Sequence, residues 1–140
     1  MELSQPEADL LLERLKEAVR NEPLAWDGYE RFDERMISAE IDNFEFVLTI
    51  SRNPFEIRLH LRTKDGNVGL CRIDAAPYHS NPDGTELRDQ PHIHRFREGY
   101  GLEFAEPIDW YDLDDPHATL SRFLDEINGV FPNGFQFTLF

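Results

Sequence analysis

Three histidines in the middle of the chain have the residue type and spacing of a metal or acid–base site. His92 and His94 stand two residues apart in a short extended stretch, so their side chains project to the same face of a strand, and His79 lies in the loop before them. Three neutral imidazoles are a sufficient protein shell for a catalytic zinc ion. Three nearby carboxylates could orient these ligands: Asp74, Asp83 and Glu98. One interpretation is therefore a metal-dependent hydrolase.

The same histidines could instead cleave RNA without a metal. One imidazole would take the proton of a ribose 2′-hydroxyl and another would protonate the leaving oxygen, while an arginine would bind the phosphate. Imidazole suits both roles because its unperturbed pKa of about 6.5 leaves both protonation states accessible at neutral pH. The catalytic residues of such a ribonuclease would be His79, His92, His94, Arg95 and Arg97.

A structural role explains these residues as well. Phe96 shares a strand face with His92 and His94, which indicates that the histidines point inward. The stretch from Asn81 to Gly84 has the composition of an efficient turn, because proline fixes φ and glycine accepts positive φ. Residues 75–91 form a long connection of the kind that is often functional. In this interpretation the histidines only shape that connection.

A second candidate site is a run of carboxylates interleaved with two aromatic residues. Clustered carboxylates can imitate the spacing of phosphates and occupy the basic groove of a nucleic-acid-handling protein, while exposed aromatic side chains provide anchors. Their spacing does not follow that of a calcium-binding loop. The alternative is a solvated approach to a helix, with one aspartate as its N-cap. The predicted partner-binding residues are Glu103, Glu106, Asp109, Trp110, Tyr111, Asp112, Asp114 and Asp115.

The charge distribution favours a basic protein as partner. The 140-residue chain has 28 acidic residues against 14 lysines and arginines, and a formal net charge of -14. Residues 1–51 carry 13 acids and 5 bases, residues 52–97 carry 6 and 8, and residues 98–140 carry 9 and 1. Such a chain repels a polyanion over a Debye length of about 8 Å and is steered toward basic surfaces. We therefore expect no direct binding of nucleic acid.

The hydrophobic pattern predicts one α+β domain over residues 1–140. Ser4 and Glu7 match a capping box, and apolar residues at helical spacing follow to about Arg20. Alternation from residue 37 to 74 predicts an antiparallel β-meander, and Asp115 begins a second helix that ends near Gly129. We expect about five to six strands, with both helices packed on one face. The expected strands are 37–41, 44–50, 55–61, 68–74, 92–97 and an inner strand 135–140, with a loop over 26–34.

Several classes of protein are excluded by composition. No stretch approaches the roughly 18–20 consecutive apolar residues of a membrane span, and the N-terminus lacks the order of a signal peptide. The single Cys71 excludes an internal disulfide and a multi-cysteine metal site. We expect a cytoplasmic protein with no cofactor and no membrane partner, and an exposed edge strand would allow a homodimer.

The histidine segment also carries a resemblance. The pattern His-x-Asn-Pro-Asp-Gly from His79, followed by Pro-His-x-His-x-Phe-Arg-Glu-Gly-Tyr from Pro91, resembles that of small uncharacterised proteins of bacteria, phages and mobile elements. Its histidine-rich turn is similar to that of TumE-type toxins of toxin–antitoxin modules. The resemblance covers about 30 of the 140 residues. It implies a mobile-element protein, and the function expected first is an acidic inhibitor of a nucleic-acid-binding host protein, of anti-CRISPR or anti-defence type. The ribonuclease toxin and the metal-dependent hydrolase are the alternatives.

Overall fold

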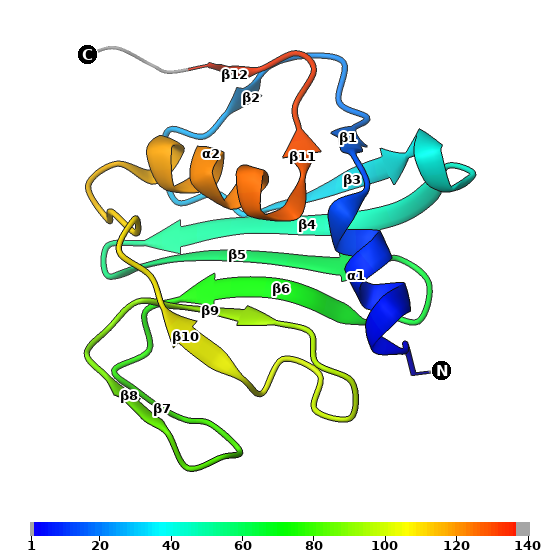
Figure 1. Cartoon of the computed structure of the whole chain (residues 1–140). Helices are drawn as coiled ribbons and strands as arrows, with labels where there is room; N and C mark the ends of the chain where they lie inside the picture. Colours follow the sequence, from blue (N-terminus) through cyan, green and yellow to red (C-terminus); the bar gives the residue numbers. More distant parts are fainter. Residues whose placement is uncertain (1, 137–140) are drawn as a thin grey trace.

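An eight-stranded sheet forms the centre of the computed structural model, which describes residues 2–136 (Figure 1). All neighbouring strands of this sheet are antiparallel except its last pair, which is parallel. In spatial order the strands are β10 (Ala105–Pro107), β9 (His92–Arg95), β6 (Gly69–Asp74), β5 (Glu56–Thr63), β4 (Phe44–Asn53), β3 (Phe32–Ser38), β1 (Lys16–Ala18) and β11 (Gly129–Val130).

The other elements are two α-helices, one 3-10 helix and two small sheets. The helices are α1 (Gln5–Glu13), η1 (Ala39–Ile41) and α2 (Pro116–Ile127). One small sheet pairs β2 (Leu24–Ala25) with β12 (Phe135–Gln136), and the other pairs β7 (Tyr78–Ser80) with β8 (Glu86–Arg88). The predicted strand 135–140 is thus described only at its start, which pairs with β2 outside the main sheet, and residues 137–140 lie outside the described residues.

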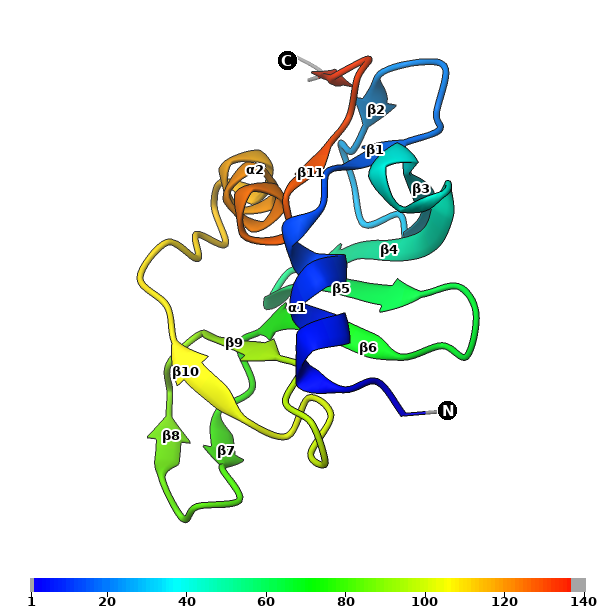
Figure 2. The same ribbon diagram turned by 45° about the vertical axis from the view of Figure 1, so that its right-hand side comes forward.

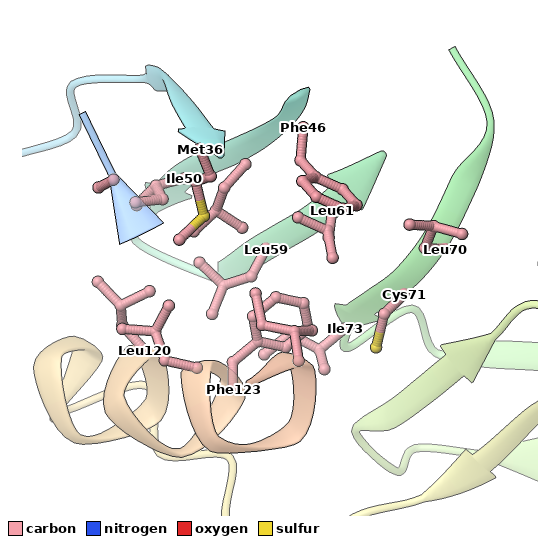
Figure 3. Close-up of a cluster of buried hydrophobic side chains, with 14 of the residues drawn as sticks. Met36, Phe46, Ile50, Leu59, Leu61, Leu70, Cys71, Ile73, Leu120 and Phe123 are labelled. Atoms are coloured by element: carbon pink, nitrogen blue, oxygen red, sulfur yellow. The ribbon is translucent and has the colours of Figure 1, made fainter. Parts of the chain in front are cut away.

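The predicted α+β class with a mostly antiparallel sheet is confirmed, and the central strands have the predicted alternation. The side chains at alternate positions of β4 and β5 are fully buried: Phe46, Leu48, Ile50, Ile57, Leu59 and Leu61. Figure 3 shows Leu120 and Phe123 of α2 facing Leu59 of the sheet. Each such side chain contributes roughly 1.5–3 kcal/mol on burial. Phe55, which was expected in this pattern, is 84% exposed because it lies in the turn before β5.

The expected number of five to six strands is wrong, because short strands escape a search for periodicity. β1, β10 and β11 have only two or three residues each. On β3 the buried side chains include Met36 and Ser38 rather than Ile37, and η1 replaces the predicted end of that strand. The expected loop 26–34 contains the start of β3 and the fully buried Trp26.

The packing of the helices also differs from the prediction. The N-terminal helix has the predicted capping box of Ser4 and Glu7 but ends at Glu13, since Arg14 is extended and the following residues join the sheet as β1. Consequently α1 is short and runs across the ends of β5 and β6, whereas α2 lies over the middle of the sheet (Figures 1 and 2). No helix within residues 2–136 is long and apolar enough to cross a membrane.

The second helix follows its prediction closely at the start. The side chain of Asp115 accepts a hydrogen bond from the backbone N–H of Ala118 at 3.1 Å, and Pro116 occupies the first turn. Its apolar face is buried as expected: Leu120, Phe123, Leu124 and Ile127. The C-terminal cap is Asn128, in the left-handed conformation with φ 54, rather than Gly129.

A buried lysine joins the C-terminal ends of the two helices. The ammonium group of Lys16 donates to the backbone oxygens of Leu12 at 3.1 Å, Arg14 at 2.8 Å and Ile127 at 2.8 Å, which uses all three of its N–H groups. Its side chain is fully buried and passes over the Phe46 ring. Burial lowers the pKa of Lys16 to about 7. The sequence pattern had placed Lys16 on the exposed face of a longer helix.

We expect the Lys16→Met variant, which keeps a long unbranched side chain, to lower the free energy of unfolding by about 1–3 kcal/mol. The reason is that three carbonyl acceptors lose their hydrogen-bond donor. The pKa of Lys16 is about 7 in the fold and 10.5 ordinarily, so the unfolded chain binds more protons between these values. The free energy of unfolding of the wild type should therefore rise from pH 7 to 9 relative to Lys16→Met, as urea unfolding would measure. Exposed Lys64, changed to Met, serves as control, and parallel profiles for wild type and Lys16→Met would contradict the assignment.

Candidate functional site

The register of β9 on β6 places two histidines beside an arginine and an aspartate. His94 lies opposite Arg72, and His92 lies opposite Asp74. These four residues alternate with Ile73 and Ile93, which are buried in the core on the side of α2. The four polar side chains therefore project from the opposite face, which we call the outer face. There His92 and His94 are each only 1% exposed, and Asp74 is buried as well.

The third histidine comes from the β7–β8 hairpin, which extends beyond the β9–β10 edge (Figure 1). Its predicted turn is present: the N–H of Gly84, at φ +91, donates to the carbonyl of Asn81 at 2.9 Å. The Asn81 side chain exchanges two hydrogen bonds with the backbone of Ala105, at 2.9 and 2.8 Å. The hairpin thereby holds the His79 ring 5.5 Å from that of His92 and 4.9 Å from that of His94, between centroids.

Each of the three imidazoles has one nitrogen fixed by a backbone carbonyl. A carbonyl oxygen only accepts, so this nitrogen carries a proton, and the other ring nitrogen is the one that could act as a ligand. One ring nitrogen of each residue lies within 4.8 Å of those of the other two. The fixing bonds are His79 Nε2 to Glu103 O at 2.8 Å, His92 Nδ1 to Gln90 O at 2.9 Å and His94 Nδ1 to Leu102 O at 2.7 Å.

The carboxylate of Asp74 lies beside the Nε2 atoms of His92 and His94. Its Oδ1 is 2.8 Å from His92 Nε2, and its Oδ2 is 3.5 Å from His94 Nε2. Burial alone would raise the pKa of Asp74, but its interactions with His94, the Ala76 N–H and His92 hold it below its usual value. Both nitrogens of His92 thus face oxygens that only accept.

The cation of this cluster is Arg72, which the sequence analysis did not assign to it. Its Nη2 lies 3.4 Å from His94 Nε2, and its Nε lies 3.3 Å from Asp74 Oδ2. A further histidine, His60, lies opposite Arg72 on β5. Burial, with smaller effects from Arg72 and Arg62, lowers the pKa of His60 to about 4, so its ring is neutral at pH 7. Only the register of β6 on β9 reveals this place of Arg72.

The two arginines predicted to act with the histidines lie elsewhere. Arg95 pairs with core residue Cys71 in the register, so its side chain points to the opposite face of β9, where it forms ion pairs with Glu106 and with Glu126 of α2. Arg97 follows β9 and lies over the Phe104 ring, 3.8 Å from its centre. Both line a cavity of about 310 Å³ on that side. The geometry therefore does not support a role for Arg95 or Arg97 beside the imidazoles.

The aromatic residues of the predicted acidic surface are anchored in the fold. Trp110 and Tyr111 are half-buried and pack against the hydrophobic core. The Tyr111 hydroxyl accepts from the Ile57 N–H at 2.5 Å and donates to the Ile57 carbonyl at 3.2 Å. Burial raises the pKa of Tyr111. These side chains therefore serve β5 and the core, and they are not the exposed anchors that the sequence pattern predicted.

Several of the predicted carboxylates also have partners within the chain. Glu106 is paired with Arg95, Asp112 accepts from the Asp114 N–H at 2.9 Å, and Asp115 caps α2. Glu103, Asp109 and Asp114 are exposed. The acidic surface is thus real, but part of it stabilises its own loop and helix.

We expect Asn81→Ala to loosen the β7–β8 hairpin and lower the free energy of unfolding by about 1–3 kcal/mol. The substitution removes the acceptor of the buried Ala105 N–H and the donor to its carbonyl. Amide hydrogen exchange should accelerate over residues 78–88 and stay unchanged in β4 and β5. Ser80→Ala, in the same hairpin but with an exposed side chain, is the control. Equal exchange in both variants would show that Asn81 does not hold the hairpin.

Comparisons with known proteins identify the family and nothing further. Neither the curated proteins nor the solved structures include a match to this chain. A model of a family of unknown function (DUF6978) matches residues 3–128, a span that contains the three histidines, Arg72, Asp74 and the acidic segment. The chain therefore belongs to this family of unknown function.

Proposed function

We propose that this chain is a metal-dependent hydrolase whose divalent ion, of the zinc class, is bound by His79, His92 and His94. One observation carries the proposal. Each imidazole donates one N–H to a backbone carbonyl, and one ring nitrogen of each histidine lies within 4.8 Å of those of the other two. Metal-ligating histidines are typically fixed in this way by a hydrogen bond at the nitrogen that does not bind the ion.

The charges around His92 support an ion in the cluster. His92 Nε2 faces the Asp74 carboxylate at 2.8 Å, and a metal ion would satisfy both of these groups at once. Three imidazole ligands leave a fourth coordination position for water, and zinc lowers the pKa of such a water to about 7. A zinc ion held by these residues would in this way supply a nucleophile at neutral pH. Asp74 contributes a negative charge beside it.

Burial favours the metal centre over the metal-free ribonuclease. A general acid and a general base must come within hydrogen-bond distance of the reacting groups, but His92 and His94 are each 1% exposed. Buried imidazoles can bind a metal ion without touching the substrate themselves, and a ligand would approach the ion from the side of half-buried His79. Cleavage of RNA by the histidines alone stays a prediction.

The acidic inhibitor of a nucleic-acid-binding host protein also stays a prediction. The net charge of -14 supports a basic partner in general terms. The packing of Trp110 and Tyr111 against the core removes the two aromatic anchors that this interpretation required. For this reason we rank it below the metal centre.

We expect the full-length chain, freed of metal by a chelator, to bind one zinc ion per chain in calorimetric titration. His79→Gln and His94→Gln should each weaken zinc binding by at least about tenfold, because each removes a ligand. His79→Gln is the more informative variant, since its half-buried position on a hairpin carries a smaller risk to folding. Zinc should also raise the melting temperature of the wild type, as binding to the folded state alone requires.

The matched control is His60→Gln, because His60 is a half-buried histidine on the outer face that lies outside the cluster. It should keep the zinc affinity of the wild type. Failure of the wild type to bind zinc, or an equal loss of affinity in His60→Gln, would contradict the proposed centre.

Hydrolysis is tested with 4-nitrophenyl acetate, an activated ester that a metal-bound hydroxide attacks. We expect zinc-dependent release of nitrophenol from the wild type and from His60→Gln, and release lowered by at least about tenfold in His79→Gln. Full zinc binding without any zinc-dependent hydrolysis would contradict the hydrolase and leave a structural metal site.

A further inference from the structure

We infer that the substrate of the metal centre is a phosphate monoester whose phosphoryl group is bound between the ion and Arg72. This inference rests on the proposed function and adds the class of substrate to it. The argument uses the position of Arg72, the charge of the occupied site and the shape of the ligand that would complete it.

Arg72 is fixed next to the place of the ion by the pairing of β6 with β9. Its Nη2 lies 3.4 Å from Nε2 of His94, the nitrogen left free to bind metal, and its Nε lies 3.3 Å from Asp74. The side chain is nevertheless 36% exposed. Arginine has five N–H donors in a rigid fork, and these two contacts leave donors for an incoming anion.

The occupied site would carry an excess of positive charge. With neutral water in the fourth coordination position, a divalent ion and Arg72 together have three positive charges, Asp74 has one negative charge, and the three imidazoles bound to the ion are neutral. The remainder of two positive charges lies in a largely buried cluster, where a charge without a counterion is costly. An anionic ligand with two negative charges would compensate this excess. The terminal phosphoryl group of a monoester has a second pKa of about 6 and is such a dianion near neutral pH.

The composition of the surrounding segment agrees with an anionic substrate. Although the whole chain is strongly acidic, residues 52–97, which form β5, β6, β9 and the β7–β8 hairpin, carry 8 bases and 6 acids. The site therefore lies in the part of the chain that least repels a phosphate. The formal charge of -14 arises from the segments on either side.

The shape of a phosphoryl group also fits two binding partners at once. It is tetrahedral, so one oxygen can bind the metal ion while two others accept parallel hydrogen bonds from the arginine fork. A carboxylate has only two oxygens and one negative charge. A water molecule would form the new P–O bond, the ester P–O bond would break, and the proton that the water loses would pass to the leaving alkoxide. The net reaction converts a phosphate monoester and water into an alcohol and phosphate.

The test measures binding of inorganic phosphate to the full chain loaded with zinc. Each protein is first adjusted to one zinc per chain by metal analysis, and phosphate is then titrated in by calorimetry at pH 7.5. We expect the wild type to bind phosphate and Arg72→Gln to bind it at least about tenfold more weakly, because a hydrogen bond to a charged group is lost. Arg72→Lys should recover part of the affinity, since it restores the charge without the fork.

Arg35→Gln is the matched control, because it makes the same change of charge on the exposed side chain of a strand in the same sheet. It should bind phosphate as the wild type does. Equal phosphate affinity in Arg72→Gln, no phosphate binding by the zinc-loaded wild type, or equally tight binding of acetate would overturn the inference while leaving the metal centre intact. A chain that binds no zinc would overturn both.

Discussion

The candidate site depends on the burial of Ile73 and Ile93, which face each other on β6 and β9. Because side chains alternate along a strand, a slip of β9 by one residue would bring its histidines into the core and expose Ile93. Two apolar side chains therefore fix the register that sets His92 opposite Asp74 and His94 opposite Arg72. The packing of the core therefore determines which polar side chains meet on the outer face.

Much of the central fold could be predicted from the sequence, because β4, β5 and α2 are long enough to show a period. The grouping of His79 with His92 and His94 could be proposed from their spacing. Arg72 could not be added, because its place beside His94 depends on which residues face each other across two strands distant in sequence. Lys16 was misplaced for a related reason, since the partners of its ammonium group include Ile127 at the far end of the chain.

The segregation of charge reconciles a strongly acidic chain with a site suited to an anion. The acidic first segment supplies α1, β1 and β3, and the acidic last segment supplies β10 and α2. Between them the near-neutral segment forms the strands that carry the histidines. Net charge determines the long-range electrostatic attraction or repulsion of large partners. The binding of a small ligand depends instead on the charged groups within a few ångströms of it. Both properties can therefore belong to one chain.

The place of β1 between β3 and β11 sets an order on how the chain can fold. The Lys16 N–H donates to the Asn128 carbonyl, and the Asn128 side chain donates to the Glu13 carbonyl, so residues more than 110 positions apart complete each other's hydrogen bonds. Such distant closure is slow, because the entropy of the intervening loop is lost before the contacts form. During synthesis β3–β4–β5–β6 can assemble as local hairpins. β1 can join β3 as soon as that strand has formed, but its other edge lacks β11 until residue 130 has left the ribosome. Until then this edge of the sheet stays open to a neighbouring chain.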